Sequence, residues 1–466
     1  MSRSKYLAKN TALFALGNIG TKMISFFLVP LYTHALNTGE YGIIDLVTTI
    51  VTFLAPIITF NIGESVMRFS LDRDSDKEKN MSIGLLFSML CLILGFAVLP
   101  FLWNLEMLKE YAWYVYLFVV TSGISQIFIC NLRGREQLLD YAISNILHTL
   151  AIALTNILLL LRFHMGIKGY FTAYIVSNLI TILYCTIRGN VIYTLFHFRI
   201  DKDLLKAMSS YSMVLIPTSF MWWIMNSSDR IMVTAMIGVT ANGIYAISYK
   251  VPTLLSTLSI VFNQAWSYSA IKENESEDRE AFNNLVYDKM VHTLSLATAG
   301  MIMLMKPFLH YYVNPAYYEA WKYTPYLIIG FLFMTLGSFL STSYTVYKDS
   351  KGFLYSGMFG AVINVILNFL LIPIIGVAGA ALATCISYIS VFVFRCFHTR
   401  KYIYIHVLRK DHFIDYCFLL IMAGTMFIDT FYGQLLLCLE FLFLLLMERN
   451  TFLELFHFVF KRRKTC

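Results

Sequence analysis

Long apolar segments recur along almost the whole chain and restrict it to a small set of folds. A helix needs about 20 apolar residues to cross a bilayer, and segments of this length repeat between Thr11 and Met447. Residues are 58% hydrophobic and 14% charged, far from the composition of soluble domains. Strands of a membrane barrel would alternate in polarity over only about ten residues. The sequence therefore predicts an all-α integral membrane protein.

The apolar segments predict about fourteen transmembrane helices. The first segment is too long for the apolar part of a cleavable signal peptide, so we expect it to stay in the membrane. The expected spans are 10–36, 41–67, 81–103, 112–132, 141–162, 169–187, 207–238, 243–270, 285–305, 324–346, 353–374, 379–397, 413–428 and 433–447.

The distribution of basic residues predicts the orientation. Cytoplasmic segments of membrane proteins carry an excess of Lys and Arg, which favours a cytoplasmic position for both termini. The net charge of +8 then reflects membrane topology and not nucleic-acid binding, and the basic cluster at 461–464 is expected to contact anionic lipid head groups. The basic residues left in outer loops are Lys109, Arg162, Lys168, Lys306 and Lys322.

Two pairs of segments indicate an internal repeat. GIKGYFTAYIVS (166–177) aligns without gaps with GVAGAALATCIS (376–387), and HALNTGEYGII (34–44) parallels AMIGVTANGIY (235–245). Chance recurrence of Gly-x-x-Gly turns is the alternative. We expect two six-helix lobes related by a pseudo-two-fold axis along the membrane normal, with substrate between them near the midplane. The predicted parts are a first lobe at 1–187, a cytoplasmic linker at 188–206, a second lobe at 207–397 and two extra helices with a basic tail at 398–466.

Polar residues at helical spacing form faces on several spans. A charge at the centre of a membrane helix costs roughly 2.5–3.5 kcal/mol or more, so we expect these faces to turn toward a bundle interior or a water-filled cavity. The candidate cavity residues are Asn18, Lys22 and Ser25 in the first span, Asn226 and Arg230 in the seventh, Lys250, Thr257 and Gln264 in the eighth, and Asn364 and Asn368 in the eleventh.

Three cations within the spans are the candidate substrate-binding groups. Asp229 is expected to meet Lys250 across the turn at 239–242, either as a structural pair or as part of a site, which would leave Arg230 without an acidic partner. Lys22 is too far from either helix end for its ammonium group to reach the interface easily. Lys22, Arg230 and Lys250 together suit an anionic substrate such as a phosphate or pyrophosphate.

Acidic residues in the spans are candidates for ion coupling. Asp45, Glu64 and Asp229 are placed where a change of protonation could accompany transport, although anchoring at the interface is the alternative for the first two. We expect no catalytic residues, no metal site and no cofactor beyond a proton or sodium gradient. GNIGTK (17–22) lacks the spacing of a nucleotide-binding loop, and the sequence has no His-Glu-x-x-His or paired Cys/His pattern.

Three segments resemble one transporter family. DRIMVTAMIGVTANGIYAISYK (229–250) resembles the Asp-Arg, Gly, Gly-x-Tyr signature of the polysaccharide-transporter branch of the MOP exporter superfamily. NVILNFLLIPIIGVAGAALATCISY (364–388) is similar to a second recurring segment of that family, and so is the opening YLAKNTALFALGNIGTKMISFFLVPLY, which is followed by EYG. Members of this branch are the flippases of O-antigen and capsule repeat units.

The resemblance implies a MATE-like, two-lobed bundle that moves polyprenyl-pyrophosphate-linked oligosaccharides outward across a bacterial or archaeal plasma membrane. Cations in the central cavity of such flippases face the pyrophosphate, and Lys22, Arg230 and Lys250 match by type and place. Glycan polymerases and glycosyltransferases are the implied partners, because they consume and supply the repeat unit. A multidrug or cation antiporter of the same superfamily is the second hypothesis, and a membrane glycan polymerase the third.

Overall fold

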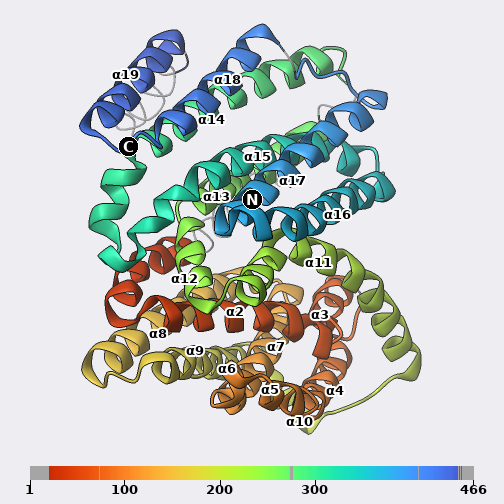
Figure 1. Cartoon of the computed structure of the whole chain (residues 1–466). Helices are drawn as coiled ribbons and strands as arrows, with labels where there is room; N and C mark the ends of the chain where they lie inside the picture. Colours follow the sequence, from red (N-terminus) through yellow and green to blue (C-terminus); the bar gives the residue numbers. More distant parts are fainter. Residues whose placement is uncertain are drawn as a thin grey trace, which may run out of the picture. The chain divides into compact units, whose positions relative to one another are not determined.

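The computed structural model describes residues 20–72, 74–272, 276–407, 409–449, 451 and 453, and within these ranges the regular elements are all helices (Figure 1). The chain forms two compact units, Met1–Gly243 and Ile244–Cys466. The prediction of an all-α architecture is confirmed.

The first unit is built around one central helix. Residues 20–35 are helical, and α7 packs against α2, α3, α4 and α9. The helices are α2 (Thr38–Ile58), α3 (Ile62–Ser70), α4 (Lys77–Phe96), α5 (Leu99–Asn104), α6 (Glu106–Lys109), α7 (Ala112–Gly134), α8 (Leu138–Asn156), the π-helix η1 (Ile157–Arg162), α9 (Gly166–Arg188), α10 (Val191–Phe196), α11 (Lys202–Met236) and the start of α12 (Val239–Ser248).

The predicted second span, 41–67, is divided into α2 and α3. Asn37 and Glu40 form a capping box at the start of α2, each side chain accepting a hydrogen bond from the other's backbone N–H at 2.9 Å. The helix stops after Ile58 because Phe60 and Asn61 take positive φ angles of 50° and 51°, a conformation in which L-residues do not continue a right-handed helix.

The second unit has α15 and α17 at its centre, packed against each other, with α16 against α17 and α13 and α14 against α15. The two C-terminal helices pack on α14 (Figure 1). The elements are the rest of α12, α13 (Pro252–Lys272), α14 (Arg279–Tyr312), the 3-10 helix η3 (Pro315–Lys322), α15 (Thr324–Val346), α16 (Ser350–Ile375), α17 (Val377–His398), the 3-10 helix η4 (Thr399–Lys401), α18 (Lys410–Thr425) and α19 (Phe431–Met447).

Eight helices of the described part are long and apolar enough to span a bilayer. Of the others, α11 and α14 carry charged residues at their starts and within them, and α18 and α19 have only 16 and 17 residues. A multi-pass membrane protein is thus supported, while the number of about fourteen spans and the orientation stay predictions.

The aligned segments 166–177 and 376–387, which are 210 positions apart, have matching local structure. Gly166 begins α9 with φ +55°, and Gly376 precedes α17 with φ +63°; both lie in the left-handed region that favours glycine. Eleven residues further along in each segment, the hydroxyls of Ser177 and Ser387 each donate to the carbonyl four residues earlier at 2.6 Å. The aligned residues therefore have the same structural roles within their respective units.

The compact units divide within α12 and not at the predicted linker 188–206. The reason is that α11 packs on helices of the first unit. Ser65 of α3 donates to the carbonyl of Met208 at 2.7 Å, and the indole N–H of Trp223 donates to the carbonyl of Thr49 at 3.2 Å. The predicted repeat states which helices of the two lobes are equivalent, and this stays a prediction.

Two glycines allow α2 and the first turn of α12 to cross at backbone contact. A Cβ on Gly42 would overlap the carbonyl oxygen of Val239, and a Cβ on Gly243 would overlap that of Thr38. The contact is reciprocal, because Thr38 and Gly42 correspond to Val239 and Gly243. Each pair is 201 positions apart, as are the aligned segments 34–44 and 235–245. A pair of segments related by a two-fold axis would make such a contact.

We predict that Gly42→Ala destabilises the protein by about 1–3 kcal/mol, because the added methyl group has no space against the rigid backbone of the crossing helix. The unfolding temperature in detergent measures this change. Gly357→Ala is the matched control, since no atom lies within 4 Å of a Cβ on that helical glycine. Equal unfolding temperatures for the two variants would contradict the close crossing.

Candidate functional site

The glycine crossing positions a buried ion pair. The guanidinium Nη1 of Arg230 on α11 lies 2.7 Å from Oδ1 of Asp45 on α2, with side-chain exposures of 19% and 7%. The amide of Asn242 on α12 donates to the other carboxylate oxygen at 3.3 Å and to the carbonyl of Gly42 at 3.2 Å. The carboxylate of Asp45 therefore connects three helices of the first unit, and it balances a cation placed among apolar side chains.

This pair corrects one prediction from the sequence. The expectation that Arg230 has no acidic partner is wrong, because the chain brings Asp45 to it from 185 residues away. Asp229 is 1% exposed and accepts the backbone N–H of Arg230 at 2.9 Å. Lys250 is half-buried. Because Asp229 and Lys250 belong to different units, their pairing stays a prediction.

The polar face predicted for the first span lies partly outside the described residues. Asn18 is among the residues that are not described. Lys22 and Ser25 lie on the helix 20–35 with exposed side chains, and the Ser25 hydroxyl donates to the carbonyl of Thr21 at 2.9 Å. Glu64, the acid predicted near the inner end of the second span, is half-buried in the first turn of α3.

The polar face of α16 points toward a neighbouring helix. Asn368 donates to the side-chain oxygen of Asn364 at 3.0 Å, and Asn364 donates to the hydroxyl of Thr384 on α17 at 3.3 Å. The two asparagines are 0% and 1% exposed. The prediction that this face avoids lipid is confirmed, whereas a role in lining a cavity stays a prediction.

Two other predicted cavity residues bond within their own helices. The amide of Asn226 donates to the carbonyl of Trp222 at 2.6 Å, and the hydroxyl of Thr257 donates to the backbone carbonyl of Thr253 at 3.1 Å. The side chain of Gln264 is outside the described part. Hydrogen bonds of this kind satisfy a polar side chain locally and assign it no ligand.

A cavity of about 340 Å³ lies in the first unit among α2, α7, α8 and α9. Its wall contains His148, whose Nε2 lies 3.1 Å from Oδ1 of Asn178, and the amide of Asn178 donates to the hydroxyl of Ser122 at 3.0 Å. Phe118 and Tyr174 add an aromatic surface with ring centroids 5.0 Å apart. Sequence reasoning missed this polar group, because its members come from three helices.

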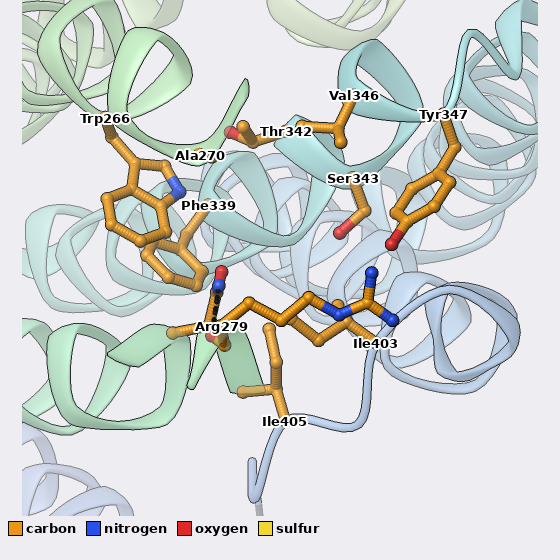
Figure 2. A pocket seen from close by; sticks show the side chains of 11 residues that line it. Trp266, Ala270, Arg279, Phe339, Thr342, Ser343, Val346, Tyr347, Ile403 and Ile405 are labelled. Atoms are coloured by element: carbon orange, nitrogen blue, oxygen red, sulfur yellow. Dashed lines mark hydrogen bonds between the residues drawn. The ribbon is translucent and has the colours of Figure 1, made fainter. Parts of the chain in front are cut away.

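A second hollow, in the second unit, is too small for a substrate. Figure 2 shows Trp266 and Phe339 on one side, with ring centroids 4.7 Å apart, and Arg279 extending past Ile403 toward Tyr347. Its volume of about 20 Å³ has room for about one water molecule. This hollow is therefore a packing feature among α13, α14 and α15.

The comparison with protein families decides which family the chain represents. The model of a family described as polysaccharide biosynthesis protein matches residues 7–273. The chain belongs to this family. An uncharacterized membrane protein of Methanocaldococcus jannaschii is 24% identical over 428 residues, which are 85% of this chain and 99% of the relative.

Solved transporters share the fold of this polysaccharide biosynthesis family member. The lipid II flippase MurJ in an inward closed conformation matches with a TM-score of 0.68 at 15% identity, covering 94% of this chain and 99% of the flippase. An inward-facing MATE family multidrug resistance transporter of the MOP superfamily matches with a TM-score of 0.63 at 14% identity, covering 83% and 94%. The MATE-like fold is thereby confirmed.

We predict that Asp45→Asn destabilises this family member by about 3–5 kcal/mol, because it removes the carboxylate charge that pairs with the partly buried guanidinium of Arg230 at 2.7 Å. Unfolding in detergent measures the change. The control is Asp72→Asn, which breaks a pair of the same 2.7 Å length whose side chains are 52% and 59% exposed. An exposed pair of this kind contributes at most about 1 kcal/mol, so equal losses in the two variants would contradict a structural role of the buried pair.

Proposed function

We propose that this protein is a flippase that moves polyprenyl-pyrophosphate-linked oligosaccharide units from the cytoplasmic to the outer face of the plasma membrane by alternating access. The units would serve the synthesis of a surface polysaccharide such as O-antigen, capsule or exopolysaccharide. The observation that carries this proposal is the combination of family and fold: a polysaccharide biosynthesis family match over 7–273, and likeness to a lipid II flippase over 94% of the chain.

In this proposal cations bind the pyrophosphate. Lys22 and Lys250 each offer an ammonium group to the phosphate oxygens, and Arg230 offers a planar guanidinium that can hold two oxygens at once. Charge-assisted hydrogen bonds of this type are about twice as strong as neutral ones. A diphosphate bound by all three would have most of its charge balanced during its passage.

The ion pair gives Arg230 two partners that compete for its guanidinium. A pyrophosphate that binds Nη1 competes with the Asp45 carboxylate, whose Oδ1 lies 2.7 Å from that nitrogen. Displaced, the buried Asp45 loses its cation and becomes a better acceptor for a proton or a sodium ion. Asp45 is thus our first candidate for ion coupling, with Glu64 and Asp229 as the other two.

Membrane orientation and partners follow from the same proposal. With both termini in the cytoplasm, the substrate would enter from the side on which glycosyltransferases assemble the unit. A glycan polymerase on the outer face would then consume the flipped product.

A multidrug or cation antiporter is the second candidate, supported by the MATE transporter that matches over 83% of this chain. Cationic drugs and pyrophosphates require opposite charges in the site. The two functions therefore differ in whether the cations are required: transport of a pyrophosphate needs them, and transport of a cationic drug does not.

The decisive experiment is mass spectrometry of lipid-linked glycans in cells lacking the protein. A flippase predicts that single, unpolymerised units accumulate on the cytoplasmic face while the surface polysaccharide is lost. Single units on the outer face would point to a polymerase. An unchanged glycan profile together with drug sensitivity would support the antiporter.

Complementation of that strain tests the assigned cations. We predict that Lys22→Ala and Lys250→Ala each lower surface polysaccharide at least about tenfold while the protein still inserts, since a lost charged hydrogen bond costs about 1.5–3 kcal/mol. Lys109→Ala, which removes an exposed lysine at the end of α6, is the control. Full complementation by both test variants would refute the assignment of these cations.

A further inference from the structure

A cluster of histidines and carboxylates joins α14 to α18 in the second unit. Asp288 and His292 lie one turn apart on α14, and Asp411 and His412 are adjacent in the first turn of α18. One ligand atom from each of these four side chains lies within 4.8 Å of the others. Figure 1 shows α18 running beside α14. We define these four residues as the inter-helix cluster.

The hydrogen bonds of His412 fix which of its nitrogens faces the cluster. Its Nδ1 lies 3.2 Å from the carbonyl oxygen of Val407, and because a carbonyl only accepts, Nδ1 carries the proton. In a neutral imidazole the lone pair is then on Nε2. This atom lies 2.9 Å from Oδ1 of Asp288, so two acceptors face each other. Such a contact needs a proton or a cation shared with the carboxylate.

His292 is held between two pairs of carboxylates. Its Nδ1 lies 3.1 Å from Oδ2 of Asp415 and 3.0 Å from Oε1 of Glu448, so this nitrogen donates a hydrogen bond. Its Nε2 faces the inter-helix cluster, 3.6 Å from Asp288 and 3.8 Å from Asp411. A carboxylate on one nitrogen and an open lone pair on the other is how proteins orient a metal-binding histidine.

Buried Asp415 provides a second, independent indication of a cation-binding site. Its side chain is 1% exposed and directs Oδ2 at His292, while its Oδ1 is buried and accepts no hydrogen bond within the described residues. A carboxylate removed from water to this extent requires compensation by positive charge. A metal ion on the far nitrogen of His292 would supply it by polarising the imidazole.

The charges around the cluster favour a divalent cation. Four carboxylates gather here, from Asp288, Asp411, Asp415 and Glu448. Arg409 contacts two of them, Asp288 at 2.9 Å and Asp411 at 2.7 Å. In these ion pairs of the described residues, one guanidinium faces four carboxylates, which leaves an excess of negative charge at two imidazoles.

We propose that Asp288, His292, Asp411 and His412 bind one divalent transition-metal ion of the zinc class, with Asp415 and Glu448 orienting His292 from behind. Two imidazole nitrogens and two carboxylate oxygens are a ligand set that suits four-coordinate Zn²⁺, and hard ions such as Mg²⁺ prefer oxygen ligands alone. The bound ion would hold α18 on α14 and, through Glu448, the end of α19. None of these six residues is among those assigned to flipping.

Sequence reasoning predicted no metal site because the ligands have no recognisable spacing. The two histidines are separated by more than a hundred residues, and each has its acidic neighbour at a spacing common in helices. The site exists only once α18 packs on α14. The one local indication of the site in the sequence is the i, i+4 spacing of Asp288 and His292, which places both side chains on one helix face.

The test uses the purified full-length protein, stripped with a chelator and titrated with ZnCl₂ in detergent. We expect one tightly bound Zn²⁺ per chain, and a weakening of at least about a hundredfold in His412→Ala. Asp415→Asn should weaken binding about 10–100-fold, the effect usual for a residue that orients a ligand. His310→Ala, which removes an exposed histidine of the same unit, should bind like the wild type.

Cobalt substitution gives a spectroscopic readout of the metal coordination itself. Co²⁺ in a four-coordinate site with two nitrogens has visible absorption bands, which should appear in the wild type and His310→Ala and be absent in His412→Ala. Circular dichroism checks that His412→Ala stays helical, and Asp411→Asn, whose side chain is 38% exposed, is the milder replacement if it does not.

Absence of stoichiometric zinc binding by the wild type would overturn the proposal and leave the two histidines as hydrogen-bond partners of the carboxylates. Equal affinity in the wild type, His412→Ala and Asp411→Asn would overturn it as well. Because binding is measured without transport, neither result bears on the proposed flippase function.

Discussion

An apolar environment gives no partner to a charge or to a backbone polar group, and this constraint determines most of what the chain does. Within the described residues it explains why the regular structure is entirely helical, since a helix satisfies its own backbone. It also explains the pairing of Arg230 with Asp45. Neither residue could be kept so far from water alone, so the packing of α2 against α11 has to bring them together.

The approach of these helices depends on backbone contact at Gly42 and Gly243. Any side chain there would overlap a carbonyl oxygen of the crossing helix. The close contact lets the Asn242 amide reach both the backbone of α2 and the Asp45 carboxylate. The ion pair therefore depends on the steric fit of the helices. The two glycines set the distance between the backbones of α2 and α12, and this distance lets Asn242 hydrogen-bond to the Asp45 carboxylate.

Sequence reasoning predicted what short-range physics decides. Helix positions follow from apolar length, the matching local structure of 166–177 and 376–387 follows from their alignment, and the buried face of α16 follows from four-residue spacing. It failed where tertiary packing decides. The break in the second span depends on the positive φ angles of Phe60 and Asn61. The Asp45–Arg230 pair joins residues 185 positions apart, and no local pattern in either segment identifies the partner.

The Asp45–Arg230 pair and the inter-helix cluster differ in their ratio of acidic to basic groups, and this difference separates their proposed roles. The Asp45–Arg230 pair matches one charge with one, so a phosphate can replace the carboxylate at the guanidinium at less cost than creating a bare cation. That makes it suited to a substrate that comes and goes. The cluster on α14 and α18 instead gathers four carboxylates around two imidazoles and one guanidinium. Exchanging partners within the protein does not neutralise this excess of negative charge, whereas a permanently bound cation would. A transporter of this design would use the balanced pair for the substrate and the unbalanced cluster to hold its C-terminal helices in place.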